Sequence, residues 1–312
     1  MEIRQSTDTI MMIRPVRFRM NEQTAVNNYY QKVLDGLSAE DVQKKALSEF
    51  DDFVEKLRLK GVNVIVVDDT LDPDTPDSIF PNNWISFHDD GRIGLYPMFA
   101  ENRRLERRTD IIENLRDQFT VSALVDFTEF EGSSIFLEGT GSMILDRPNK
   151  IVYAAMSERT QVEPLNEFCE AFSYEAVKFV ANQDVEGARL PIYHTNVMMC
   201  VADDFAILCI DSIDDQEERK AVVKKLESTG KEVISISEDQ KHHFAGNMLQ
   251  VRSTDDNIYL IMSGAAFQSL NNDQISKIQK YCPIIHSSLD TIEALGGGSA
   301  RCMMAEVFLP KK

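Results

Sequence analysis

Near its carboxyl end the chain carries the segment 296–302, GGGSARC, followed at once by the apolar run 303–308. Three consecutive glycines leave main chain without side chains, so a substrate can lie directly against the backbone. We expect Cys302 to open a strand that holds its thiol in one place. A buried structural thiol beside a flexible loop is the alternative reading. The segment favours Cys302 as a nucleophile, with Gly297 and Gly298 beside the substrate.

Four other polar motifs occur along the chain. We take one residue of each as its marker, namely Asn83, Glu138, His194 and Asn247. With Cys302, consecutive markers are about 55 residues apart, and a regular period of this kind indicates repeated structural units. Cysteine, histidine, glutamate and amides are the residue types of a thiol hydrolase.

A similar order of elements follows each marker. Alternating apolar residues around turn signals predict hairpins, then a helix, then a strand. The hairpins are expected at 85–96, 142–155, 197–210 and 248–261, the helices at 105–119, 161–172, 215–228 and 274–281, and the strands at 121–125, 176–180, 232–236 and 283–286.

The fifth unit starts at Cys302 and can be completed only by the amino-terminal segment. That segment supplies a strand at 11–14, a helix at 38–60 and a strand at 62–67. Ser38 is expected to cap the helix. The apolar positions at helical spacing are Val42, Ala46, Phe50, Phe53, Val54 and Leu57. Five units closed by the chain's own start predict an α/β ring, propeller-like, in a single domain spanning 1–312.

Composition excludes several classes of function. A net charge of −18 leaves no basic excess for a nucleic-acid backbone, although it allows a cationic or zwitterionic metabolite to approach. The apolar run 10–13 is too short for a membrane span or a secretory signal. Five cysteines without a CxxC pair indicate reduced thiols and a cytoplasmic protein. The cysteines and histidines are not clustered as metal ligands would be, so the sequence predicts no metal site.

If every unit begins at the same point of the ring, the markers face one central site. Cys302 would be the nucleophile, His194 the acid/base, and Glu138 the carboxylate that orients the imidazole. A free thiol with a pKa of about 8.5 is only slightly ionised at neutral pH, so neighbouring groups must activate it. The alternatives are a hydrogen-bonded structural histidine and a glutamate in a turn.

The motifs resemble those of the amidinotransferase, or pentein, superfamily, which includes arginine deiminases, dimethylarginine dimethylaminohydrolases and glycine amidinotransferases. The resemblance covers nearly the whole chain and is greatest to bacterial hydrolases of citrulline utilisation. It rests on the motifs 80–84 (FPNNW), 138–143 (EGTGSM), 157–160 (SERT), 194–199 (HTNVMM) and the Cys302 segment.

The resemblance implies a five-bladed αββαβ propeller with pseudo-fivefold symmetry and a covalent thiol mechanism without metal or organic cofactor. By position, Cys302, His194 and Glu138 match the family's nucleophile, acid/base and supporting acid. Arg159 matches an arginine that arginine deiminases use on the substrate α-carboxylate; the alternative is a surface ion pair.

Asn83 and Asn196 stand where arginine deiminases have aspartates. Two carboxylates suit a guanidinium, whereas two carboxamides offer donors and acceptors without charge and suit a ureido group. Burying a guanidinium without a counter-charge costs several kcal/mol. Asn247 and Phe80, with Gly297 and Gly298, complete the predicted substrate-binding set.

The favoured function is therefore a cysteine hydrolase that converts citrulline to ornithine, carbon dioxide and ammonia. Arginine deiminase or another guanidine-modifying hydrolase or amidinotransferase is the main alternative, since Glu138 supplies one negative charge. A non-catalytic propeller binding factor is the third. The expected partner is a small amino acid, with no nucleic acid or membrane, for a monomer or homodimer.

Overall fold

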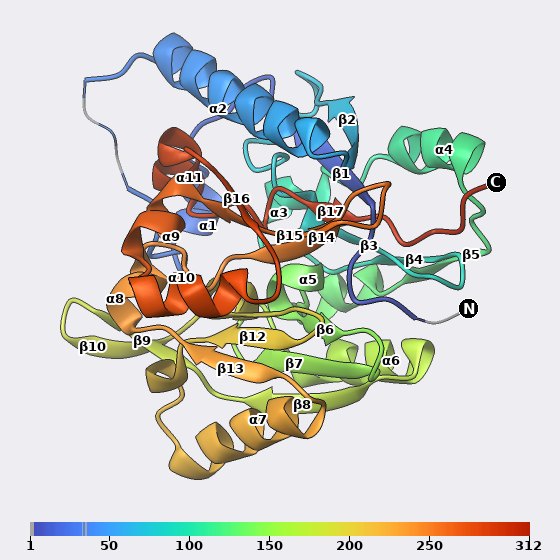
Figure 1. Cartoon of the computed structure of the whole chain (residues 1–312). Coiled ribbons are helices and arrows are strands. Elements are labelled where there is room, and N and C mark those ends of the chain that lie inside the picture. Colours follow the sequence, from blue (N-terminus) through green and yellow to red (C-terminus); the bar gives the residue numbers. More distant parts are fainter. Residues whose placement is uncertain (1–2, 33, 35) are drawn as a thin grey trace.

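The computed structural model describes residues 3–32, 34 and 36–312. Within them the chain forms five small mixed sheets of three strands, and one separate hairpin. In each sheet the first two strands pair antiparallel, and the second and third pair parallel. A parallel pair needs a crossover connection, and a helix provides it each time. These helices lie outside the sheets (Figure 1).

The strands repeat in three sets. The first strands are β3 (Ile85–Phe87), β6 (Ile144–Asp146), β11 (Met199–Val201), β14 (Leu249–Arg252) and β17 (Ala305–Glu306). The second strands are β4 (Arg92–Leu95), β7 (Ile151–Ala155), β12 (Phe205–Leu208), β15 (Ile258–Ser263) and β1 (Thr9–Arg14). The third strands are β5 (Ala123–Asp126), β8 (Glu175–Phe179), β13 (Glu232–Ser235), β16 (Ile284–Ser287) and β2 (Asn63–Asp68).

The crossover helices are α4 (Thr109–Gln118), α6 (Val162–Phe172), α7 (Gln216–Ser228), α10 (Asn272–Gln279) and α2 (Ala39–Leu59). Helix α2 confirms its prediction in detail. Ser38 forms a capping box with Asp41, and the six apolar positions named above are the buried ones.

The fifth sheet confirms that the chain's own start completes the last unit. Its strand order is β17-β1-β2, with Ile10 opposite Glu306 and Met11 opposite Ala305. Strand β1 is buried on both faces: Ile10 and Met12 enter one apolar cluster, and Met11 and Ile13 enter another. A strand buried on both sides reads as a continuous apolar run, as this one does.

Short helical turns precede the first strands, and here the predictions were partly wrong. The turns η1 (Pro81–Asn83), α5 (Gly139–Ser142) and η3 (Thr195–Val197) hold the marker motifs. Cys302 does not open a strand. Its N–H and that of Met303 bond back to the carbonyl of Ser299, so it lies in a turn that ends before β17.

Other boundaries also differ from the prediction. The helix expected at 105–119 begins at Thr109, because Glu106 forms a buried ion pair with Arg103 and Arg108 has extended dihedral angles. The sequence did not predict the hairpin of β9 (Asn182–Val185) and β10 (Ala188–Pro191). It also did not predict α11 (Asp290–Gly296), which ends at the glycines.

The remaining short helices connect these units. They are α1 (Glu22–Ala25), α3 (Glu101–Arg104), η2 (Thr128–Ser133), η4 (Ile210–Ser212), α8 (Glu238–His242) and α9 (Gly264–Ser269). None of the helices in the described ranges has the length and apolarity to cross a membrane. All five cysteines lie in these ranges and are free thiols.

Candidate active site

The turns that precede the first strands, together with the loop between β7 and α6, bring the predicted site residues to one small cavity. The predicted residues that line it are Phe80, Asn83, Arg159, His194, Gly297, Gly298 and Cys302. Glu138, Asn196 and Asn247 lie directly behind them, each bonded to His194 or Cys302.

The sulfur of Cys302 is surrounded by amide donors. Nδ2 of Asn196 and Nδ2 of Asn247 each lie 3.3 Å from Sγ. The Asn247 amide has a fixed orientation, because its Oδ1 accepts the N–H of Arg301 and its Nδ2 donates to the Asn196 carbonyl, both at 3.0 Å. Its N–H group must therefore face the sulfur, an arrangement that favours negative charge there.

His194 and Glu138 form a buried pair, with 2.7 Å between Nε2 and Oε2. Burial alone raises the pKa of Glu138, but Arg159, His194 and Arg103 outweigh it and hold that pKa well below its usual range. Burial lowers the pKa of His194 to about 4 despite the Glu138 hydrogen bond. His194 is thus neutral at pH 7, and its Nδ1 remains for exchanging protons with a substrate.

Gly141 in α5 lies between two of these side chains. A Cβ atom there would be 2.3 Å from Asn83 Nδ2 and 2.9 Å from His194 Nδ1, closer than atoms can approach. The motif Glu138–Ser142 therefore supplies the carboxylate and also the space in which Asn83 and His194 meet.

Arg103 is a site residue that the sequence did not reveal. It is 2% exposed, and its Nη1 donates to Asn83 Oδ1 at 2.7 Å. It also pairs with Glu106 at 2.8 Å and donates to the Phe80 carbonyl at 3.1 Å. Arginine has no acceptor, so the Asn83 amide must present Nδ2 to the cavity. That nitrogen is buried and has no partner among the described residues.

Arg159 is 1% exposed, which excludes the surface ion pair. Its guanidinium lies 3.5 Å from Glu138, and it stacks over the rings of Phe99 and Tyr193 at 5.3 and 5.2 Å. It donates to the Thr24 carbonyl, but its Nε is buried without a partner in the part of the chain described.

The glycines contact side chains of the protein. A Cβ atom on Gly296 or Gly298 would lie 2.7 or 2.9 Å from the Phe80 ring. Gly297 has a left-handed φ of 62° and accepts the Tyr193 hydroxyl at 2.7 Å. The glycines thus allow the Phe80 ring to approach the main chain. The sequence had instead predicted that this main chain would lie bare against the substrate.

The cavity has a volume of about 10 Å³, room for about one water molecule. Thr24 and Asn28, from the segment around α1, contribute to its lining, as does Asp77. A molecule larger than water can bind there only if part of the lining moves. Asp77 and Tyr193 are further lining residues that the sequence did not reveal.

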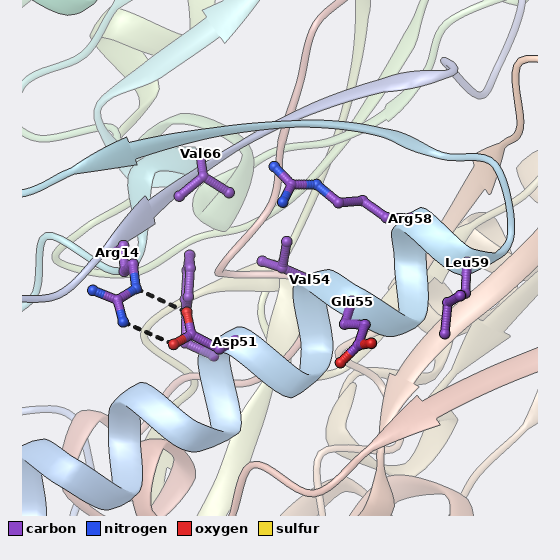
Figure 2. Close-up of a pocket in the computed structure, with 8 residues that line it drawn as sticks. Arg14, Asp51, Val54, Glu55, Arg58, Leu59 and Val66 are labelled. Atoms are coloured by element: carbon purple, nitrogen blue, oxygen red, sulfur yellow. Dashed lines mark hydrogen bonds and ion pairs between the residues drawn. The ribbon is translucent and has the colours of Figure 1, made fainter.

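The larger hollow in the surface lies elsewhere. It has a volume of about 550 Å³, lies between α2 and β2, and contains none of the predicted residues (Figure 2). Arg14 and Asp51 pair there at 2.7 Å, and Arg58 donates to the Val64 carbonyl. Its lining contains no thiol, imidazole or carboxamide, so the small cavity remains the chemical candidate. Across residues 3–32, 34 and 36–312, no group of three or more acidic, histidine or cysteine side chains could hold a metal ion.

Comparison with known proteins identifies the family. A family model described as N,N dimethylarginine dimethylhydrolase, eukaryotic, matches residues 14–309. The chain belongs to this family of the pentein superfamily. Pentein hydrolases of this kind modify guanidino groups. A search of curated proteins found no significant match.

Solved structures share the pentein fold. ArgZ, an arginine dihydrolase from the ornithine-ammonia cycle in cyanobacteria, superposes with a TM-score of 0.74 at 15% identity over 97% of this chain. This pentein spans only 41% of full-length ArgZ but 98% of its N-terminal domain. An adduct of dimethylarginine dimethylaminohydrolase with S-methyl-L-thiocitrulline gives a TM-score of 0.60 at 15% identity, covering 96% of this chain and 98% of that one.

Proposed function

We propose that this pentein hydrolyses citrulline to ornithine, carbon dioxide and ammonia through a covalent intermediate on Cys302. The observation that carries the proposal is the 2.7 Å hydrogen bond from Arg103 to Asn83 Oδ1, which leaves Asn83 Nδ2 facing the cavity. In the same proposal the five sheets are the blades of one propeller domain with pseudo-fivefold symmetry, spanning 1–312.

The free amide groups match a ureido group. Asn83 Nδ2 offers a donor, and Asn196 Oδ1 is a buried acceptor without a partner in the described chain. A ureido group carries one oxygen beside N–H donors, so it satisfies both. A guanidinium carries only donors, and Asn83 Nδ2 would face another N–H group, which leaves two donors unpaired.

The chemical step follows from the protonation states. Neutral His194 accepts the proton of the Cys302 thiol, and the amides of Asn196 and Asn247 stabilise the sulfur as it becomes negative. Sulfur attacks the ureido carbon, one C–N bond breaks, and His194 returns the proton to the departing nitrogen. Water then attacks the thioester-like carbon and releases the thiol and a carbamate, which decomposes to carbon dioxide and an amine.

The remaining groups that line the cavity suit the α-carboxylate and α-amino group of an amino acid. Arg159 has an unpartnered Nε and is proposed to bind the α-carboxylate. Asp77 Oδ1 is likewise unpartnered among the described atoms and is proposed to accept the α-amino group. Phe80, Gly297 and Gly298 line the same cavity.

Arginine is the second candidate substrate. The ionised Glu138 behind His194 favours a cation, and ArgZ, with the same fold, is an arginine dihydrolase. A purely binding role is disfavoured by the assembled thiol, imidazole and carboxylate.

The test is ammonia and ornithine release from citrulline, arginine, agmatine and methylarginine by the purified wild type. Citrulline is expected to give the highest kcat/KM, with ornithine and ammonia in equal amounts. Cys302→Ser is the matched control and should release neither product while remaining folded. A higher kcat/KM for arginine would refute the citrulline assignment, and full turnover by Cys302→Ser would refute covalent thiol catalysis.

A further inference from the structure

Glu293 is a buried carboxyl group that the proposed reaction does not use. It lies on α11 and is 6% exposed, and its Oε1 accepts the hydroxyl of fully buried Ser299 at 2.5 Å. Its backbone carbonyl accepts the N–H of Gly297 at 3.0 Å. One residue therefore holds the glycine segment at two points.

Ser299 connects this carboxyl to the nucleophile. The Ser299 carbonyl accepts the N–H of Cys302 at 3.0 Å and closes the turn that carries the thiol. On the other side of the turn, the N–H of Arg301 is held by Asn247. If the Glu293 bond is lost, Ser299 is held by its backbone alone, and the turn can shift relative to the amides around Cys302.

The carboxyl has no ion-pair partner in the described part of the chain. Burial raises the pKa of Glu293 to about 7, although hydrogen bonds from Ser263 and Ser299 oppose the shift. The ionisable groups around it are Asp290 on the same helix, Glu49 on α2, Lys32 beside α11, and Tyr29, Tyr30, His242 and His243 across the neighbouring cavity. Asp290 and Glu49 favour the protonated form.

We propose that Glu293 is a positioning residue that holds the Cys302 turn in its reactive place through Ser299. The hydroxyl bond to an ionised carboxylate is stronger than that to a neutral acid. The turn is therefore firmest above the pKa of Glu293 and loosens as pH falls through about 7. A loosened thiol affects kcat more than KM, since substrate contacts elsewhere are unchanged. The kinetic part of this argument rests on the proposed hydrolase function.

The experiment measures alkylation of Cys302 by iodoacetamide between pH 6 and 9, followed by peptide mass spectrometry, alongside kcat and KM for citrulline. Half-buried Cys169 serves as an internal reference thiol. Glu293→Ala and Ser299→Ala are each expected to lower the Cys302 alkylation rate and kcat roughly ten- to a hundredfold. Their combination should cost little more than either alone, because both remove the same bond.

Glu293→Gln retains an acceptor oxygen and the side-chain volume, so it is expected to keep most of the alkylation rate at pH 8. Its rate should no longer show the step near pH 7. Asp290→Asn removes a negative charge that favours protonated Glu293, so it is expected to keep the alkylation rate at pH 8 and to move the step to lower pH. Glu113→Gln removes an exposed charge from α4 and is the matched control, with no change expected.

The proposal is overturned if folded Glu293→Ala alkylates at the wild-type rate, or if Glu293→Gln keeps the wild-type pH step. If Glu293→Ala does not fold, the proposal is tested by the alkylation rate of Ser299→Ala and by the pH step of Glu293→Gln. Loss of alkylation in a protein that does not turn over citrulline would refute the substrate and retain the positioning role.

Discussion

At the scale of single residues, the orientation of the Asn83 side chain carries the proposed substrate specificity. An asparagine can present either its oxygen or its nitrogen to a substrate, and only a neighbour decides which. Arg103 carries only hydrogen-bond donors, so it binds Oδ1 and fixes the orientation of the amide here. In the proposed function, the substrate preference then depends on a pair of residues that are 20 positions apart in the chain.

Replacing Asn83 and Asn196 with aspartate tests this preference. Asn83→Asp puts a carboxylate oxygen where Nδ2 is proposed to meet the ureido oxygen, and Asn196→Asp puts one where Nδ2 donates to the Cys302 sulfur. We expect kcat/KM for citrulline to fall about thirty- to a thousandfold, or roughly 2–4 kcal/mol. Arginine should bind more tightly, because its cation gains two partners. Steady-state kinetics and calorimetric binding check both effects, and full citrulline activity in the double variant would contradict them.

The buried His194 predicts a pH dependence of stability. Its native pKa of about 4 lies below its ordinary value of 6.5, so the unfolded chain takes up the proton first as the pH falls. The free energy of unfolding should therefore decrease as the pH falls from about 6.5 to about 4. Glu138, with its lowered pKa, adds a further loss at the acidic end of this range.

Urea unfolding at pH 7.5 and 5 would measure this loss in the wild type and in His194→Gln. The variant should lose less stability than the wild type over the same interval, because it has no imidazole to protonate. Equal losses in the two proteins would show that His194 is not buried as a neutral group.

At the scale of elements, the turn α5 determines how closely two side chains approach. Gly141→Ala would force Asn83 or His194 to move, since both lie within 3 Å of the new methyl group. We expect citrulline kcat to fall at least about tenfold, with a loss of stability of about 1–3 kcal/mol from overpacking.

Gly132→Ala is the matched control for that change. Gly132 lies on η2 with nothing within 4 Å of a new Cβ, and its φ is not in the left-handed region. Activity and thermal unfolding of this variant should match the wild type. If Gly141→Ala also matches the wild type, the close approach through α5 is not required.

At the scale of the whole molecule, strand β1 joins the first and last parts of the chain. Ile10 is fully buried between β17 and β2, and its side chain packs in the same apolar cluster as the Cys302 turn. Ile10→Ala should lower the free energy of unfolding by about 2–5 kcal/mol through the cavity it leaves. Val26→Ala, at a position 65% exposed, should change it little. Chemical denaturation of both variants gives the comparison.

Much of the fold was predictable because it rests on local patterns. The buried face of α2, its Ser38 cap, and the hairpin–helix–strand order follow from apolar spacing and turn residues. Completion of the fifth unit by the amino-terminal strand followed from counting elements. The turn at Cys302 could not be predicted this way, because hydrogen bonds to Asn247 and Ser299 override the strand pattern of the apolar run.

For the site, the sequence by itself determined which chemical groups are available and that they recur at a common point of each unit. Cys302, His194, Glu138 and the asparagines were identified by type and spacing, and the structure brings them together. The tertiary structure alone decided their orientation and charge. Arg103 orients Asn83, and burial makes His194 neutral, because both effects depend on neighbours from distant segments and on the exclusion of water.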